Sequence, residues 1–195
     1  MSSRDSTSRD SDATASERTS WVPAFAVLLA AALFGYLVLP YASHPSGGGN
    51  GKLVGAMAPD FSLPVFQGGD AGNRIRLSAL QGNVVVLDFW ASWCKPCLAQ
   101  AHILSQLAPQ HAGQKVMFVG INTADTRENA LQFAKTHELP YPSVLDTGEV
   151  ADAYGASGLP TLVVIDPSGR VRSEVSGVMS AREVEAAITA ATPAG

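Results

Sequence analysis

The two cysteines of this 195-residue chain, Cys94 and Cys97, are separated only by Lys95 and Pro96. They follow the apolar run 84–90 and precede a stretch that can form a helix, so we expect the first thiol at a helix N-terminus. The unsatisfied backbone N–H groups of a helix N-terminus favour thiolate over thiol. The second thiol lies one turn further along, where it can resolve a mixed disulfide within the molecule. The spacing therefore predicts a dithiol that exchanges electrons with other disulfides.

A plain stabilising disulfide is the alternative interpretation of the same pair. Closing so small a loop restrains little of the conformational entropy of the unfolded chain, so the bond would be a poor staple. Lys95 either adds a positive charge that further favours the thiolate or is an ordinary solvated lysine. Pro96 suits the first turn of a helix, where its missing N–H is not needed.

Composition argues against several other classes of protein. Two cysteines and four scattered histidines do not supply a convincing four-ligand zinc site, and the chain carries no flavin or nicotinamide signature. We therefore expect no metal and no other cofactor. The formal net charge of −4 provides no basic surface, so nucleic acid is not an expected partner.

The N-terminal part of the chain differs in composition from the rest. Residues 1–20 are rich in Ser, Thr, Asp and Arg without hydrophobic periodicity, and we expect a disordered cytoplasmic tail. Residues 22–39 carry no charge over eighteen positions, just enough for a helix to cross the hydrocarbon core of a bilayer, which predicts a transmembrane anchor over 21–41. A cleaved signal peptide is the alternative, but its apolar region is usually shorter, about 7–15 residues, and ends in a small-x-small site.

Basic residues predict the orientation of this anchor. Three arginines precede it within residues 1–20, whereas the first positive residue after it is Lys52. Because flanking Lys and Arg favour the cytoplasmic side, the N-terminus should lie inside and the bulk of the chain outside. The Gly/Ser-rich segment 42–52 then acts as a flexible linker, and residues 53–195 form one domain of ordinary size.

Apolar periodicity predicts that this domain is α/β. Runs rich in Val, Ile and Phe indicate four strands, and the nearly continuous apolar character of the first three is typical of sheets covered on both faces. Capping-box signals at Asp125–Glu128 and Ser180–Glu183 indicate two helix starts. Parallel strands joined by helical crossovers should be followed by an antiparallel hairpin and a closing helix. The expected strands are 84–89, 115–121, 161–166 and 171–176; the expected helices are 95–108, with Leu98, Ala101, Leu104 and Ala108 on one face, 125–136, and one that follows Ser180.

Several motifs carry a resemblance to a known family. The run from Asp88 to Cys97, Asp-Phe-Trp-Ala-Ser-Trp-Cys-Lys-Pro-Cys, together with Gly158-Leu159-Pro160-Thr161, resembles the thioredoxin superfamily. The segments 58–63, 77–82 and 154–161 narrow the resemblance to the membrane-anchored TlpA/ResA branch of redoxins, over residues 53–190. This resemblance implies a thioredoxin-like fold with an N-terminal extension and a central helix and strand inserted near 129–150.

The family resemblance also implies roles for individual residues. Cys94 would be the nucleophile and Cys97 the resolving thiol of a redox disulfide. Pro160 would follow a cis peptide bond after Leu159, in a loop that packs beside the cysteines and pairs with an incoming extended peptide. We assign Trp93, Leu159, Lys95 and Pro96 to substrate binding.

Asp88 interrupts the apolar strand six positions before Cys94. A buried carboxylate there is costly and should have a raised pKa, which suits it to accept a proton from the Cys97 thiol. The resemblance to cytosolic thioredoxins, which carry Asp at this place, implies the same role. The membrane-anchored branch more often has Asn there and a Glu-x-Pro after the second cysteine, where this chain reads Gln100-Ala101-His102. We therefore expect proton handling to depend on Asp88 rather than on an acid of the helix.

The function expected first is that of an anchored thiol–disulfide oxidoreductase outside the bacterial cytoplasmic membrane, on the periplasmic side. It would reduce disulfides in exported proteins, and the family resemblance suggests apocytochrome c as the first substrate to consider. Turnover would need electrons from a membrane dithiol donor, and residues 22–39 would contact the lipid bilayer. An oxidant or isomerase of secreted proteins is the main alternative.

Three further alternatives match the sequence less well. A peroxiredoxin would have a Pro and a Thr or Ser where this chain has Trp90 and Cys94 ahead of Cys97. A copper-binding chaperone of this type would space its thiols as Cys-x-x-x-Cys and add a His ligand. A pure interaction module would leave the dithiol without a role.

Overall fold

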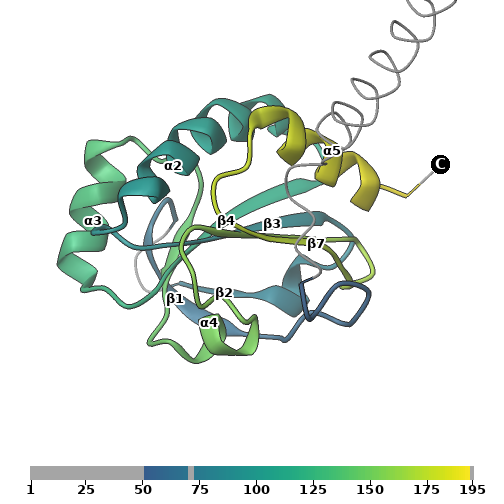
Figure 1. Cartoon of the computed structure of the whole chain (residues 1–195), viewed down its shortest axis with the longest axis horizontal. Coiled ribbons are helices and arrows are strands. Elements are labelled where there is room, and N and C mark those ends of the chain that lie inside the picture. Colours follow the sequence, from purple (N-terminus) through teal and green to yellow (C-terminus); the bar gives the residue numbers. More distant parts are fainter. Residues whose placement is uncertain (1–50, 70–72, 194–195) are drawn as a thin grey trace, which may run out of the picture. The chain divides into compact units, whose positions relative to one another are not determined.

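A mixed seven-stranded sheet organises the part of the chain that the computed structural model describes, residues 51–69 and 73–193 (Figure 1). The strand order is β2-β1-β5-β4-β3-β6-β7. The strands are β1 (Ser62–Gln67), β2 (Arg74–Arg76), β3 (Val84–Trp90), β4 (Val116–Asn122), β5 (Ser143–Leu145), β6 (Thr161–Ile165) and β7 (Val171–Ser176). The helices are α2 (Lys95–Leu107), α3 (Arg127–Thr136), α4 (Glu149–Ala153) and α5 (Ala181–Ala191), with short 3-10 helices η1 (Leu77–Leu80) and η2 (Ala108–His111).

The predicted tail and anchor, residues 1–20 and 21–41, lie outside the described residues, as does most of the predicted linker 42–52. Among the residues that the structure does describe, no helix combines the length and the apolar character needed to cross a membrane.

The centre of the sheet confirms the predicted α/β arrangement. β3 and β4 are parallel neighbours connected through α2, and β6 runs antiparallel to β3 and forms the predicted hairpin with β7. β5 is the strand that the family resemblance placed near 129–150, although no apolar pattern indicated it. Three short elements go beyond the prediction: β1, β2 and α4. β2 and β5 have three residues each and α4 has five, too few to show a period, and β1 contains Pro64, which weakens a strand pattern.

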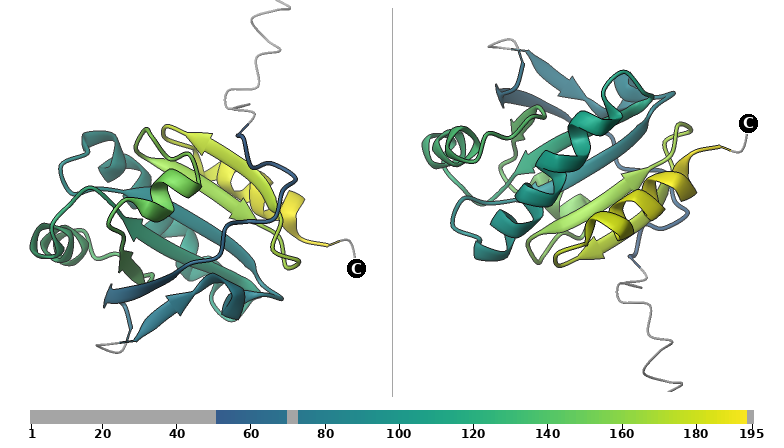
Figure 2. Two further views of the ribbon diagram at one scale, coloured as in Figure 1. Left: turned by 90° about the horizontal axis from the view of Figure 1, so that it is seen from below. Right: turned by 90° about the horizontal axis from the view of Figure 1, so that it is seen from above.

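Both faces of the sheet are covered, and Figure 2 shows α2 and α5 lying across one of them. Val86 and Trp90 of β3 belong to the core beneath α2, α3 and α5, whereas Leu87 and Phe89 belong to the core on the other face, with α4. Because side chains alternate along a strand, Asp88 shares the face of Val86 and Trp90. Burial on both faces of the sheet thus explains the nearly continuous apolar run of β3, as expected from the sequence.

Polar caps start the last helix and α3. Ser180 and Glu183 form the predicted capping box of α5, with the Ser180 N–H donating to the Glu183 carboxylate at 2.8 Å. The box predicted at 125–128 is wrong. Thr126 is the N-cap of α3, and its Oγ1 accepts the backbone N–H three residues later at 3.2 Å. Asp125 does not cap the helix because its carboxylate binds a different loop.

The inward face of α2 is rotated relative to the prediction. Leu98 was expected in the core but is 43% exposed, whereas Ala101 and Leu104 are buried as expected. A cysteine and a glutamine complete the buried face of α2. Because glutamine is polar, a hydrophobicity pattern does not indicate the correct rotation of the helix. The buried residues of α2 are Cys97, Gln100, Ala101, Leu104 and Leu107.

Gly120 of β4 lies between two polar neighbours, opposite Asp88 of β3 and Ser143 of β5. A Cβ atom at this position would lie 2.6 Å from Ser143 Oγ and 2.9 Å from Trp90 Nε1. Both distances are shorter than van der Waals contact. We therefore expect Gly120→Ala to lower the free energy of unfolding by about 1–3 kcal/mol. Urea denaturation of residues 47–195, which form one compact unit, measures the change.

A second substitution separates this clash from other effects. Adding Ser143→Ala removes the atom closest to the new methyl group, and Ser143 Oγ is without a hydrogen-bond partner in the described part of the chain. The double variant should therefore recover part of the lost stability. Equal stability of the single and double variants would contradict this explanation.

Candidate active site

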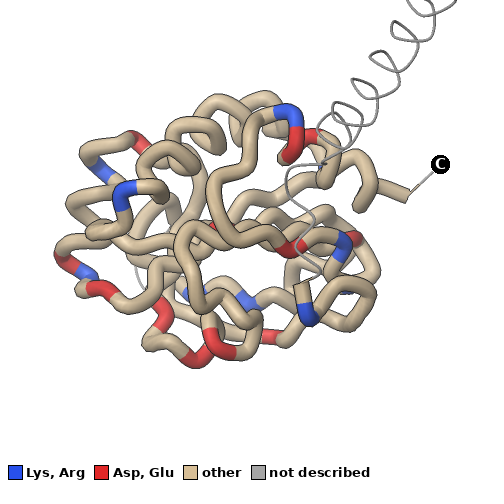
Figure 3. The backbone as a smooth tube through the Cα atoms, viewed as in Figure 1, with Lys and Arg blue, Asp and Glu red and all other residues tan. Residues whose placement is uncertain are grey.

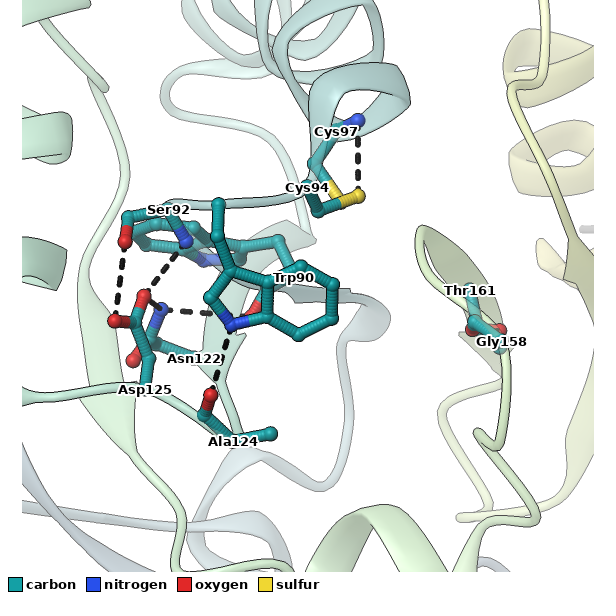
Figure 4. Close-up of a disulfide and its surroundings, with 10 residues drawn as sticks. Trp90, Ser92, Cys94, Cys97, Asn122, Ala124, Asp125, Gly158 and Thr161 are labelled. Carbon is teal, nitrogen blue, oxygen red and sulfur yellow. Dashed lines mark hydrogen bonds between the residues drawn. A yellow bond between two sulfur atoms is a disulfide. The ribbon is translucent and has the colours of Figure 1, made fainter.

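Cys94 and Cys97 are joined by a disulfide at the start of α2, with 5.3 Å between their Cα atoms (Figure 4). Cys94 is the N-cap residue of the helix, and the Cys97 N–H donates a hydrogen bond to its Sγ at 3.3 Å. Cys94 is 5% exposed and Cys97 only 1%. The first sulfur therefore lies at a helix N-terminus, as the sequence predicts, where the N–H donor and the helix dipole both stabilise a thiolate.

A groove of about 610 Å³ opens beside Cys94. It is lined by all four residues assigned to substrate binding, namely Trp93, Lys95, Pro96 and Leu159. Its other walls come from the end of β4, from α4 and from the segment before Leu159: Thr123, Ala124, Gly148, Ala151, Asp152, Ala156 and Ser157. The first sulfur of the dithiol thus borders a channel with room for a segment of another polypeptide.

The Leu159–Pro160 peptide bond is cis, as the family resemblance implied. Pro160 is buried, while Leu159 lines the groove. Thr161 anchors this segment, because its Oγ1 donates to the carbonyl of Gly158 at 2.7 Å and lies 2.8 Å from Ser176 Oγ. The segment before β6 is therefore fixed beside the dithiol, where the resemblance placed it.

Asp88 is 2% exposed and has Tyr141 as its one hydrogen-bond partner in the described residues. The Tyr141 hydroxyl donates to Asp88 Oδ2 at 3.2 Å, and Oδ1 has no partner among those residues. Burial raises the pKa of Asp88 to about 7, and the Tyr141 hydrogen bond opposes this rise. Asp88 faces the helix layer, and Cys97 belongs to the same core as its neighbours on that face. Most charged residues lie on loops and helix ends in Figure 3, so a buried acid in a central strand stands out.

Gln100 occupies the position on α2 where the membrane-anchored branch frequently has a glutamate. It is fully buried, and its Oε1 accepts the Met179 N–H at 2.7 Å. Its Nε2 has no hydrogen-bond partner among the described residues. The inward face of α2 therefore carries an amide, and Asp88 is the buried acid on this side of the sheet among the described residues.

Two residues of the site were not found from the sequence in the roles that the structure gives them. Tyr141, in the connection between α3 and β5, reaches Asp88 across 53 positions of the chain. Asp125, which the pattern assigned to a helix cap, binds Ser92 two positions before Cys94. Local sequence patterns carry no signal for either contact, because both join segments that only the folded sheet brings together.

Histidines and acids do not gather into a cation site in the part of the chain that the structure describes. Within residues 51–69 and 73–193, no three His, Cys, Asp or Glu side chains lie together so as to hold a metal ion. His102 pairs with Gln106 on the exposed side of α2, and His111 lies 3.0 Å from the Glu185 carboxylate of α5.

A disulfide at a helix N-terminus, in this sheet and beside a cis-proline segment, is typical of a class of enzyme, the thioredoxin-like thiol–disulfide oxidoreductases. The chain belongs to the AhpC/TSA family, whose model matches residues 54–174. It is 34% identical over 133 residues to the thiol-disulfide oxidoreductase ResA of Geobacillus thermodenitrificans, which covers 68% of this chain and 74% of that protein. The ResA of Bacillus subtilis is 36% identical over 127 residues, 65% of this chain and 69% of that protein.

Solved structures place the chain in the same class. A Chlorobium tepidum protein described as a thiol:disulfide interchange protein DsbE has a TM-score of 0.64 and 31% identity, over 71% of this chain and 96% of the other. A secreted Mycobacterium tuberculosis disulfide oxidoreductase, described as homologous to E. coli DsbE, has a TM-score of 0.59 and 28% identity, over 67% and 95% of the two chains.

Proposed function

We propose that this enzyme reduces disulfides in exported proteins and is held at the outer face of the bacterial cytoplasmic membrane by residues 22–39. The observation that carries the proposal is the unequal placement of the two sulfurs. Cys94 lies at the helix N-terminus and borders the groove, whereas Cys97 is buried behind it. A substrate disulfide can therefore meet the first sulfur, and the second sulfur is left to react within the molecule.

The reaction proceeds by two exchange steps. In the reduced enzyme the Cys94 thiolate attacks one sulfur of a substrate disulfide, and the other substrate sulfur leaves as a thiolate. Cys97 then loses its proton and attacks Cys94 Sγ, which releases the second substrate sulfur. This step forms the Cys94–Cys97 disulfide that the structure contains. Two electrons pass to the substrate, and its two sulfurs take up two protons.

Asp88 is the proposed acceptor of the Cys97 proton. It shares the helix-facing side of β3, and both cysteines belong to the core on that side. With a pKa of about 7, raised by burial, its carboxyl group can accept and return a proton near neutral pH. Gln100, which is buried on the inward face of α2, carries an amide that cannot take this role.

The surface around the dithiol supports a protein substrate rather than a small one. Trp93, Leu98 and Val178 are large apolar side chains that are 63%, 43% and 44% exposed. Trp93 and Leu98 flank the cysteines in sequence, and Val178 precedes Met179, whose N–H binds α2. Trp93 also lines the groove, and exposed apolar side chains that lie together are typical of surfaces that bind another protein. Apocytochrome c is the first substrate to test, as the family resemblance suggests.

The proposed location depends on the N-terminal residues and on relatives. Arginines precede the uncharged run 22–39 and none follows it before Arg74, which favours an N-terminus inside the cell. The related Mycobacterium tuberculosis enzyme is described as secreted. Outside the membrane the enzyme would need a membrane dithiol donor to return it to the reduced state.

The reduction potential tests the proposed direction of electron flow. We expect a value near or below about −270 mV, the range of thioredoxin, because a reductant must transfer electrons to the disulfides of exported proteins. The full chain in detergent is equilibrated with thiol–disulfide buffers, and the Cys94→Ser variant, which cannot close the disulfide, serves as the blank. A value above about −180 mV would instead indicate an oxidant or isomerase.

A further inference from the structure

The segment from Asn122, the last residue of β4, to Thr126 holds the turn that carries Cys94. The Trp93 indole Nε1 donates to the carbonyl of Ala124 at 2.9 Å, and the Thr123 N–H donates to the carbonyl of Trp90 at 3.0 Å. Asp125 binds Ser92, which lies between these two tryptophans and two positions before the nucleophile. Figure 4 shows this side of the site, with Asp125 and Ala124 below the turn and the disulfide beyond it.

Asp125 is the centre of these contacts. Its carboxylate accepts the Ser92 N–H at 2.6 Å and the Ser92 hydroxyl at 3.0 Å. It also accepts the Asn122 side-chain amide at 3.0 Å and the Thr126 N–H at 2.8 Å. Partial burial acts to raise the pKa of Asp125, but these hydrogen bonds outweigh it and lower the pKa below the usual value. The carboxylate is therefore ionised at neutral pH, and hydrogen bonds to an ionised acceptor are the stronger kind.

The groups that donate hydrogen bonds to Asp125 indicate the role of its carboxylate. α3 does not need it, because Thr126 Oγ1 already caps that helix. Both groups of Ser92 that can donate are used by Asp125, and Ser92 lies two positions before Cys94. The same segment supplies Thr123 and Ala124 to the groove. One carboxylate thus connects the turn that places the nucleophile to a wall of the groove beside it.

We infer that Asp125 is a positioning residue for thiol–disulfide exchange: it fixes the Ser92–Cys94 turn so that the Cys94 sulfur stays at the N-terminus of α2 and at the edge of the groove. The inference rests on the exchange chemistry of the proposed function, but on no particular substrate and no cellular location. Asp125 does not touch the reacting sulfurs, and it acts through the turn. Without it, the sulfur would spend less time where the helix N–H groups stabilise its thiolate.

Alkylation of the reduced enzyme tests this role without a protein substrate. With the full chain in detergent at pH 7, we expect Asp125→Asn to lower the rate constant for iodoacetamide at Cys94 by roughly three- to ten-fold. The midpoint of the pH–rate profile should move upward. Removal of a negative charge alone would have the opposite effect, because it would favour the thiolate. A rate equal to or above that of the wild type would therefore overturn the inference.

Asp166 provides a matched control. Its carboxylate accepts the Ser168 N–H, the Ser168 hydroxyl and the Arg170 N–H in the turn between β6 and β7. That turn lies at the opposite end of the strands from Cys94, where Ile165 pairs with Val85 at the start of β3. Asp166→Asn should leave the alkylation rate within about two-fold of the wild type. An equal slowing in both variants would show a general loss of stability and would overturn the inference.

A milder variant covers the case in which Asp125→Asn does not fold. Ser92→Ala keeps the charge of Asp125 and removes only the hydroxyl hydrogen bond. It should slow alkylation by roughly two- to three-fold, which corresponds to one neutral donor lost from the carboxylate. An unchanged rate and pH–rate profile in Ser92→Ala would count against Asp125 as a positioning residue. Because all of these rates are measured on Cys94 itself, they stay informative even if the proposed direction of electron flow is wrong.

Discussion

Replacing Cys97 with serine is expected to stop the reaction at the mixed disulfide. The variant keeps the Cys94 sulfur at the groove but lacks the Cys97 thiol that would release the substrate, so a covalent complex should accumulate. Turnover of a protein disulfide should fall by at least about 1,000-fold. Non-reducing electrophoresis and mass spectrometry of the reduced variant, mixed with a disulfide-containing protein, detect the complex.

Cys94→Ser is the matched control for this experiment. It should lose turnover to the same extent and yield no complex, because Cys97 is only 1% exposed and cannot meet a substrate disulfide. A complex of comparable yield through Cys97 in this variant would mean that the two sulfurs have the opposite roles.

Asp88→Asn is expected to weaken the pH dependence of stability between pH 5 and pH 8. The pKa of Asp88 is about 7 in the folded state, raised by burial from 3.8, so the folded protein holds a proton that the unfolded chain releases. Stability therefore falls as pH rises through this window, by about 3 kcal/mol from pH 5 to pH 8. The asparagine variant has no such proton to lose. Between pH 5 and pH 8, the free energy of unfolding of Asp88→Asn relative to that of the wild type should therefore rise by that amount. Urea denaturation of oxidised residues 47–195 at a series of pH values measures it.

Tyr141→Phe provides a second test of the titration of Asp88, because it removes the hydrogen bond that lowers the pKa of this carboxyl group. The Tyr141 hydroxyl donates to Asp88 and lowers its pKa, so its removal should raise the pKa of Asp88 further. The loss of stability should then continue to higher pH than in the wild type. The same stability–pH curve in wild type, Asp88→Asn and Tyr141→Phe would refute a titrating Asp88.

The sequence predicts the elements that have a clear hydrophobic pattern or capping motif, and the residues that interrupt such a pattern. β3, β4 and β6 follow from nearly continuous apolar runs, and the start of α5 follows from its Ser180–Glu183 box. Asp88 is found for the opposite reason, because a carboxylate in an apolar run contradicts its surroundings. The dithiol is recognised from its spacing and from the strand before it.

The contacts that support the site are harder to predict. Asp125 resembles a helix cap in sequence, yet the residue after it makes the cap, and the carboxylate binds Ser92, 33 positions away. Tyr141 lies in an irregular connection with no pattern of its own. Leu98 looks like a core residue until the burial of Cys97 and Gln100 sets the rotation of α2. For Asp125 and Tyr141 the partner comes from a distant segment, so local propensity carries no information about the contact.

The short distance between Cys94, which lines the groove, and Cys97, which is buried, also protects the enzyme from oxidants. When peroxide converts the Cys94 thiolate to a sulfenic acid, the Cys97 thiol condenses with it, releases water and restores the disulfide. That disulfide is the form present in the structure, with Cys97 almost entirely shielded from solvent. Further oxidation to the irreversible sulfinic and sulfonic acids requires a sulfenic acid that persists, and here its partner lies within bonding distance. The short distance between Cys94 and Cys97 therefore limits oxidation by peroxide to the disulfide, which a dithiol can reduce again.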